Sequence, residues 1–187
     1  MPSKEAAGRE IVWSGTKAPS LDYCCVKRDK GGWCFSGMIV AKFQTDPFGA
    51  QYEILVDKMF KTQQLTVEKI NTKKTTFLKI EFRDDVWIVD GKKRIDLREC
   101  TDVDIEASPV TNTIPIRRTS LGMEERVDLT AAWVRFPSLV VEPLKQSYQR
   151  LGARKYLYRS ASGFTAELDT DDFGLVTRYD DIWKEIR

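Results

Sequence analysis

The sequence predicts an all-β protein in which one long, strongly curved antiparallel sheet is followed by a short C-terminal helix. Apolar and polar residues alternate with a period of two from about Leu21 to Val176, and turn-forming residues interrupt this alternation repeatedly. The pattern divides the chain into roughly ten to twelve strands, more than a small sandwich needs, so the sheet must curl or close.

The strands are defined by the turns between them. The strongest signal is the pair Asp90 and Gly91 between VWIV and KKRIDL, because both residue types tolerate the positive φ of a type I′ turn. Trp87 should therefore lie close to Leu97 across the hairpin. Other turns between strands are predicted at residues 29–32, 45–49, 71–74 and 161–163.

Helical periodicity is confined to the end of the chain. Apolar side chains with i, i+3, i+4, i+7 spacing occur at Tyr179, Ile182, Trp183 and Ile186, and Asp180 or Asp181 is a suitable N-cap. We expect this helix to cover an end or edge of the sheet. A second helical turn is predicted at residues 143–150, with Pro143 in its first turn.

Length and charge restrict the class of protein. The 187 residues, 42% of them hydrophobic, are expected to form a single domain spanning 1–187, of which about the first ten residues fray. Thirty basic and 28 acidic side chains give a net charge of +2, too little for a nucleic-acid partner. No apolar run is long enough for a membrane span or a signal peptide, so a cytoplasmic protein is expected.

The chain has no histidine, which excludes Ser-His-Asp and Cys-His catalysis. It also has no GxxxxGK[ST] or GxGxxG loop, so no nucleotide cofactor is expected. Cys24 and Cys25 should face opposite sides of a sheet, and none of the four cysteines forms a CxxC pair. We therefore expect buried free thiols and no metal site.

The segment SPVTNTIPIRR, residues 108–118, is unusual because two prolines bracket a polar, β-branched run that ends in two arginines. Proline suits a bent or edge strand, whereas paired arginines suit an anionic or hydroxylated ligand. In a strand, Arg118 would share a face with two isoleucines and would require a carboxylate or a ligand. Asp104 and Asp57 are the candidates for that carboxylate.

An acidic strand precedes this segment, because Asp102, Asp104 and Glu106 alternate with apolar residues. Its acidic face is either solvated or paired with arginines of neighbouring strands. The candidate arginines are Arg94, Arg98, Arg117 and Arg118. The five tryptophans likewise have two interpretations, packing in the core or stacking on a ligand.

The residues CTDVDIEASPVTNTIPIRR resemble the run of a DvDl segment, a Pro-containing step and TNTLPIRR in the "putative glycolipid-binding" family, formerly a domain of unknown function. The resemblance continues through VVEP, QSY at residues 146–148, YLYRS and FTAELDTDDFGLVTRYDDIW. It implies a spiral β-roll or half-barrel and a glycolipid ligand. At residues 57–62, DKMFKT, the chain departs from the family's pattern of Asp, spacer, Trp and Thr-Arg.

Three hypotheses follow. In the first, the concave face of the sheet binds an amphipathic small molecule, glycolipid-like or lipid-like; the ligand-binding candidates are Asn112, Arg117, Arg118, Trp87, Tyr148 and Trp133. In the second, the same cavity is the active site of a cofactor-independent isomerase or cyclase with a lipid-like or natural-product substrate, in which Asp104 or Asp57 is the acid or base and an arginine stabilises negative charge. In the third, the sheet is an interaction scaffold without a cavity and both arginines form structural ion pairs.

Overall fold

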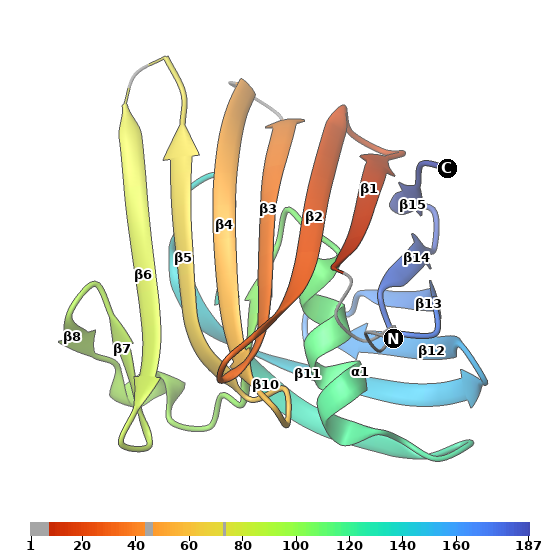
Figure 1. Cartoon of the computed structure of the whole chain (residues 1–187). Helices are drawn as coiled ribbons and strands as arrows, with labels where there is room; N and C mark the ends of the chain where they lie inside the picture. The colour runs from red at the N-terminus through yellow and green to blue at the C-terminus, as the bar shows by residue number, and fades with distance from the viewer. Residues whose placement is uncertain (1–7, 44–46, 73) are drawn as a thin grey trace, which may run out of the picture.

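The computed structural model describes residues 8–43, 47–72 and 74–187. Its N-terminal half is a meander of long antiparallel strands (Figure 1). These strands are β1 (Arg9–Gly15), β2 (Ser20–Asp29), β3 (Gly32–Lys42), β4 (Pro47–Asp57), β5 (Thr62–Ile70) and β6 (Thr75–Arg83). A short hairpin of β7 (Val86–Val89) and β8 (Lys92–Lys93) extends the meander at one edge, followed by the 3-10 turn η2 (Ile95–Leu97).

The C-terminal half continues the same sheet. Its strands are β9 (Asp102–Ile105), β10 (Arg126–Val134), β11 (Val141–Gly152), β12 (Lys155–Ser160), β13 (Thr165–Thr170), β14 (Val176–Tyr179) and β15 (Trp183–Glu185). β15 lies between β14 and β1 and so joins the two halves, whereas β9 pairs with β10 in parallel. β8 and β9 are the two ends of this 15-stranded, unclosed sheet.

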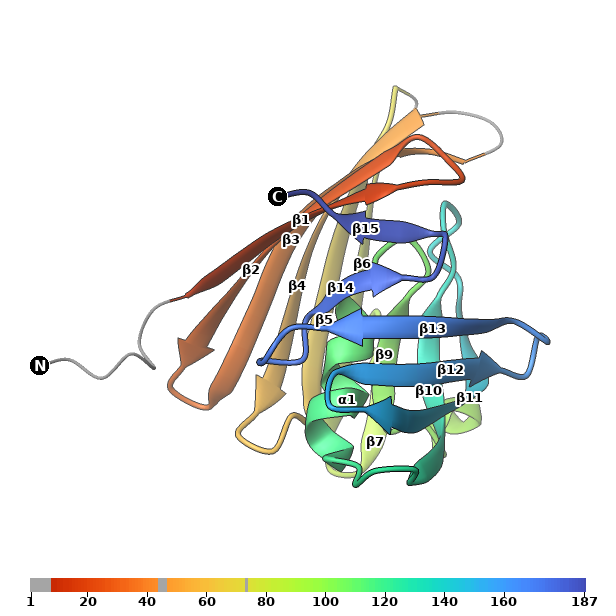
Figure 2. The ribbon, with the colours of Figure 1, turned by 90° about the vertical axis from the view of Figure 1, so that its right-hand side faces the viewer.

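The sheet folds over on itself so that its two halves face each other (Figure 2). Their strands cross, and the short helix α1 (Thr113–Thr119) with the preceding 3-10 turn η3 (Val110–Asn112) lies between them. The predicted all-β class and curved sheet are confirmed. The strand number exceeds the predicted ten to twelve because several short strands complete the roll.

The predicted turns join antiparallel strands, but the predicted strand KKRIDL is wrong beyond Lys93, because residues 95–97 form the 3-10 turn η2 and Arg94 lies opposite Trp87. Asp29 pairs with Gly32, and Asp90 and Gly91 both have positive φ, 49° and 76°, as a type I′ turn requires. Ile70 pairs with Thr75 around the predicted turn at 71–74, of which residue 73 lies outside the described residues. Of the predicted turn at 45–49, residues 45 and 46 also lie outside them.

Residues 1–7 of the predicted frayed terminus are likewise outside the described residues, but β1 already begins at Arg9. The core lies between the two halves of the roll and consists of the alternate side chains that face inward. On β4, for example, Ile54 is fully buried, as are Phe35 on β3 and Leu65 on β5. Cys24, Cys25 and Cys100 are buried and Cys34 is half-buried, and all four thiols are free.

Within the segment 108–118, the residues from Val110 onward are helical, so the predicted strand is wrong there. Pro109 precedes η3, and Pro115 falls in the first turn of α1, where a missing N–H is tolerated. Ser120, at φ 45° and ψ 45°, ends the helix in the left-handed conformation. Because neighbouring helical residues point about 100° apart, Arg117 and Arg118 have separate environments.

The predicted C-terminal helix is also wrong, since β14 and β15 occupy that segment. Tyr179 pairs with Trp183 around a tight turn in which Asp180 has φ 44°. β15 then fills the gap between β14 and β1. Pairing on both sides satisfies its backbone groups, and this non-local interaction overrides the local helical spacing.

The helical turn predicted at residues 143–150 is wrong as well, because these residues belong to β11. Pro143 pairs with Ala132 of β10 on one side, whereas the pairing with β12 on the other side extends only as far as Gln146. Pro143 therefore lies on a locally unpaired edge, where a strand tolerates a residue without an N–H.

Gly37, on β3 of the N-terminal half, leaves room for a buried polar contact in which the Tyr52 hydroxyl donates to the Asp22 carboxyl group. Gly37 lies between Cys24 and Tyr52 in the register, and a Cβ at this position would overlap the Tyr52 ring and the Tyr23 carbonyl. Gly37→Ala should therefore lower the free energy of unfolding by about 1–3 kcal/mol, as overpacking does. Urea denaturation measures this change.

Gly49→Ala is the matched control on the adjacent strand, since the nearest atom to its Cβ would be 3.9 Å away. We expect its stability to remain within about 1 kcal/mol of the wild type. Equal losses in the two variants would contradict the steric explanation.

Candidate functional site

A cavity of about 330 Å³ lies on the inner face of the C-terminal half, at the level of β9 and η3. Its wall comes from segments that are far apart in the sequence. Apolar side chains form most of it: Ile105, Trp133, Leu144, Tyr158, Phe164, Tyr179, Ile182 and Trp183. The polar lining consists of Asp104, Glu106, Ser108, Asn112, Ser160 and Ser162. The cavity thus combines aromatic walls with carboxyl, amide and hydroxyl groups, and no lysine or arginine among the described residues lines it.

Asp104 is a half-buried acid in the wall of this cavity. One carboxyl oxygen accepts a hydrogen bond from Thr111 Oγ1 at 2.8 Å, and the other accepts one from Gln146 Nε2 at 2.5 Å. Both bonds lower the pKa of Asp104, but burial raises it more, so the net shift is upward. The carboxyl group is therefore held in place by neutral donors and has no cationic partner in the part of the chain that the structure describes.

Asn112 is positioned by its neighbours in the same wall. Its Oδ1 accepts a hydrogen bond from the Tyr148 hydroxyl at 2.8 Å, and its Nδ2 donates to the Pro109 carbonyl at 3.1 Å. An amide nitrogen has two hydrogens, so one remains for a ligand. Burial keeps Tyr148 protonated by raising its pKa, which maintains it as the donor to Asn112.

The aromatic side chains of the cavity contact one another. The ring of Phe164 lies 6.0 Å from that of Tyr158 and 6.1 Å from that of Tyr179, centroid to centroid. Trp133 faces the same cavity from β10, and the Arg135 guanidinium lies 4.5 Å from its ring centroid. Edge-to-face and tilted contacts of this kind hold aromatic rings in fixed orientations.

Three sequence-predicted site residues line the cavity together, namely Asp104, Asn112 and Trp133. Tyr148 does not line it but donates the hydrogen bond that positions Asn112. Trp87 does not line it either, because its indole is buried against Phe82 and donates to the Cys100 carbonyl. Asp57 is likewise elsewhere, at the end of β4, where its carboxylate accepts hydrogen bonds from the backbone N–H groups of Met59 and Lys61.

The predicted partners of the arginines are corrected by the structure. Arg118 makes two parallel hydrogen bonds to Asp102, at 2.9 and 2.6 Å, rather than contacting Asp104 or Asp57. This bond confirms one of the pairings expected for the acidic strand. Arg94 pairs with Asp96 instead of that strand, and Arg117 lines a different cavity beside Phe173.

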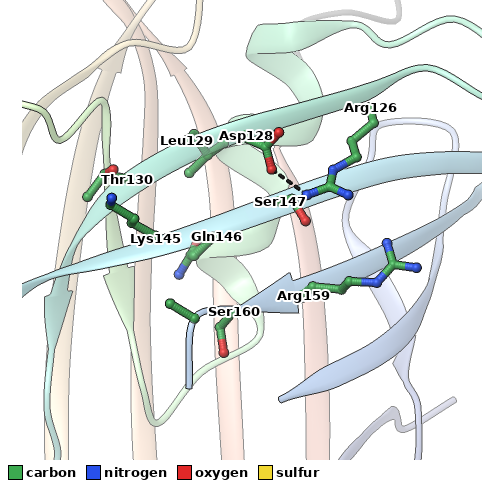
Figure 3. Close-up of a pocket in the computed structure, with 10 residues that line it drawn as sticks. Arg126, Asp128, Leu129, Thr130, Lys145, Gln146, Ser147, Arg159 and Ser160 are labelled. Atoms are coloured by element: carbon green, nitrogen blue, oxygen red, sulfur yellow. Dashed lines mark hydrogen bonds and ion pairs between the residues drawn. The ribbon is translucent and has the colours of Figure 1, made fainter. Parts of the chain in front are cut away.

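A groove of about 580 Å³ lies on the opposite, outer face of β10, β11 and β12 (Figure 3). Arg126 and Asp128 form an ion pair there at 2.6 Å. The side chains of Lys145 and Arg159 line the groove without an ion pair or hydrogen bond to any residue that the structure describes. Ser160 borders both this groove and the inner cavity.

Sequence reasoning missed several residues of the inner cavity, among them Ser108, Tyr158, Phe164, Tyr179 and Trp183. Tyr179 and Trp183 were assigned to a helix, which hid their position on adjacent strands. The alternation of YLYRS was a usable signal for Tyr158, because it identifies the inward face of β12. No local pattern indicates which of the inward residues surround a cavity.

The family described as "Putative glycolipid-binding" matches residues 10–185 of the chain. The chain belongs to this family. A crystal structure of a DUF1089 family protein from Pseudomonas aeruginosa shares 26% identity and a TM-score of 0.80, over 88% of this chain and 92% of that one. No curated protein matches.

A second solved structure shares only the fold of this glycolipid-binding family member. It is a β-barrel-like protein of the domain of unknown function DUF1849 from Brucella abortus, with 9% identity and a TM-score of 0.52, covering 96% of this chain and 95% of that one. Among the described residues, no helix is long and apolar enough to cross a membrane. No cluster of three or more potential metal ligands occurs among them either.

Proposed function

We propose that the inner cavity binds the uncharged, hydroxylated head of an amphipathic, glycolipid-like molecule. The observation that carries this proposal is the lining: the Asp104 carboxyl and the Asn112 amide face a wall of aromatic rings. Aromatic faces stack on the C–H faces of sugars, while fixed carboxyl and amide groups bind their hydroxyls. The membership of the glycolipid-binding family supports the same class of ligand.

The charge of the lining favours a neutral ligand over an anionic one. The charged side chains among the described lining residues are both acidic, namely Asp104 and Glu106. Glu106 forms an ion pair with Arg135 at 3.8 Å, whereas Asp104 has no cationic partner among the described residues. An anionic head would therefore meet the Asp104 carboxyl group without a compensating cation, which is costly. The volume of about 330 Å³ is near the lower end of the range for ligand pockets, about 300–1,000 Å³, so we assign the head and not the whole lipid to the cavity.

Phe164 marks the side from which an apolar chain would leave. It lines the cavity and is 36% exposed, whereas Trp183 is almost fully buried. The hydroxyls of Ser160 and Ser162 hydrogen-bond to each other at 2.6 Å on the same side. We expect the sugar to contact Asp104 and Asn112 and the alkyl chain to pass Phe164.

Octyl glucoside, used below its micellar concentration, should bind the delipidated protein, and Trp133→Ala should weaken the binding at least about tenfold, 1.4 kcal/mol. The loss follows from removal of a ring that faces the cavity. Isothermal titration calorimetry measures the dissociation constant. Native mass spectrometry of protein purified without detergent tests for a retained ligand.

Phe77→Ala is the matched control, because Phe77 is an aromatic residue on the outer face of β6 and is 67% exposed. This variant should bind octyl glucoside as the wild type does. The proposal fails if the wild type binds neither octyl glucoside nor a copurified lipid, or if the two variants lose affinity equally.

Catalysis by a cofactor-independent isomerase or cyclase is the alternative proposal for the same cavity, and the environment of Asp104 favours it over other enzyme classes. Burial raises the pKa of this carboxyl group, a property of general acids and bases, and it lies among aromatic walls that suit a lipid-like substrate. Asp57 does not line the cavity and is no longer a candidate for this role. Asp104→Asn should abolish turnover and retain binding if catalysis occurs, whereas unchanged turnover would exclude Asp104 as the acid or base.

A further inference from the structure

Arg117 lies in an aromatic cluster and points away from α1 in a different direction from Arg118. Its guanidinium carbon is 4.9 Å from the ring centroid of Phe60 and 5.0 Å from that of Phe173. Trp33 completes the cluster, with its ring 5.0 Å from that of Phe173. Cation–π contacts to two rings hold the planar guanidinium in a fixed orientation, which leaves its N–H groups to be satisfied from elsewhere.

No residue that the structure describes accepts a hydrogen bond from Arg117. Its Nε is buried and has no partner, whereas the neighbouring Arg118 makes two hydrogen bonds to Asp102. A buried donor without an acceptor costs about 1–3 kcal/mol, and native proteins retain few of them. The guanidinium of Arg117 is therefore a cation without a hydrogen-bonded or ion-paired acceptor among the described residues.

Arg117 lines a cavity of about 410 Å³ that has room for such an acceptor. Tyr156 lines the same cavity, and its hydroxyl makes no hydrogen bond within the described part of the chain. The nearby carboxylates are already engaged: Asp172 pairs with Arg154, and Asp171 accepts from the backbone N–H groups of residues 173 and 175 and from Arg9. The cavity therefore offers an unpaired cation and a free hydroxyl donor.

The backbone beside Arg117 is adapted to its side chain. Gly174 has φ +95°, a conformation that L side chains rarely adopt, and a Cβ there would lie 3.2 Å from Arg117 Cδ. The glycine thus lets the methylene stem of Arg117 pass against the backbone toward the two phenyl rings.

We propose that this cavity binds an oxyanion, the phosphate or carboxylate group of a small molecule or lipid head, on the guanidinium of Arg117. The two terminal guanidinium nitrogens, Nη1 and Nη2, donate in-plane hydrogen bonds to oxygens of the anion, and the Tyr156 hydroxyl adds a third donor. This site is separate from the inner cavity, whose described lining residues include no lysine or arginine. The chain therefore has one site for a neutral hydroxylated group and another for an anionic group.

The test uses the full-length protein with ¹⁵N-labelled arginine and follows the Nε–Hε resonances by NMR. Three probes are added separately at constant ionic strength: inorganic phosphate, acetate, and dihexanoyl phosphatidic acid below its micellar concentration. We expect at least one probe to shift the Arg117 resonance saturably. Tighter binding of phosphatidic acid than of phosphate identifies a lipid head as the source, and the reverse identifies a free anion.

Arg117→Lys keeps the charge but removes the fork, and should weaken binding of the effective probe at least about tenfold. Arg159→Gln is the matched control, because Arg159 is another unpaired arginine but lies in the outer groove. This control should bind the probe as the wild type does.

Two results would overturn the proposal. One is the absence of any saturable shift of the Arg117 resonance with all three probes. This test uses the wild-type protein alone, so it does not depend on the folding of a variant. The other is binding that survives in Arg117→Lys and disappears in Arg159→Gln, which would assign the anion to the outer groove.

Discussion

Arg118→Met should lower the free energy of unfolding by about 3–5 kcal/mol, the cost of breaking a buried ion pair. Asp102 is only 1% exposed, and Arg118 supplies its two charge-assisted hydrogen bonds, with a third bond from Thr101 Oγ1 at 2.7 Å. Removal of the guanidinium leaves a carboxylate that is buried without a counter-charge. Guanidinium chloride denaturation at neutral pH measures the loss.

The double variant Arg118→Met, Asp102→Asn should recover most of this loss, because the buried charge is then gone as well. Arg126→Met is the matched surface control: its ion pair with Asp128 has both side chains at least half exposed, so its removal should cost about 0–1 kcal/mol. If Arg118→Met and Arg126→Met are equally stable, the Asp102 pair has no special structural role.

Asp22→Asn should stabilise the protein at neutral pH by an amount on the order of 3 kcal/mol and should flatten the pH dependence of stability. Asp22 is fully buried in β2 and accepts hydrogen bonds from the hydroxyls of Ser108 and Tyr52. Burial outweighs these two bonds and raises the pKa of Asp22 from 3.8 to about 8. Between pH 3.8 and about 8, Asp22 therefore stays protonated in the folded protein, whereas the unfolded chain releases this proton.

The sign of the effect follows from that proton. The contribution of Asp22 to stability is fully present below pH 3.8 and falls by about 1.4 kcal/mol per pH unit as the pH rises towards 8. An amide has no charge to bury, so the variant lacks this fall. The measurement is urea denaturation of both proteins at several pH values between 4 and 8.

Asp128→Asn, at an exposed carboxylate of β10, should leave the pH dependence as it is in the wild type. The contribution of Asp104 is common to all three proteins and cancels in their differences. Parallel stability curves for the wild type and Asp22→Asn would contradict the raised pKa. Ser108, which donates a hydrogen bond to Asp22, also lines the inner cavity. The affinity for octyl glucoside can therefore be measured in the same pH series as the stability.

The candidate site was only partly predictable from the sequence. The alternation of DVDIEA correctly places Val103 and Ile105 in the core, with Asp102 and Asp104 on the other face. It could not decide which acid meets an arginine, because that depends on the position of α1 over β9. The helix brings Arg118 to Asp102 and leaves Asp104 to neutral donors, so two acids in one strand differ in environment.

The sequence by itself determined the all-β class, the hairpins at residues 29–32 and at Asp90 and Gly91, and the inward faces of the long strands. These features depend on interactions between residues close in the chain, such as turn geometry and the alternation of side chains. Only the tertiary structure decided that residues 110–119 are helical, that β15 joins β14 to β1, and that Arg117 and Arg118 have different surroundings. Each of these outcomes depends on contacts between distant segments, whose free energy exceeds the local preference of the residues involved.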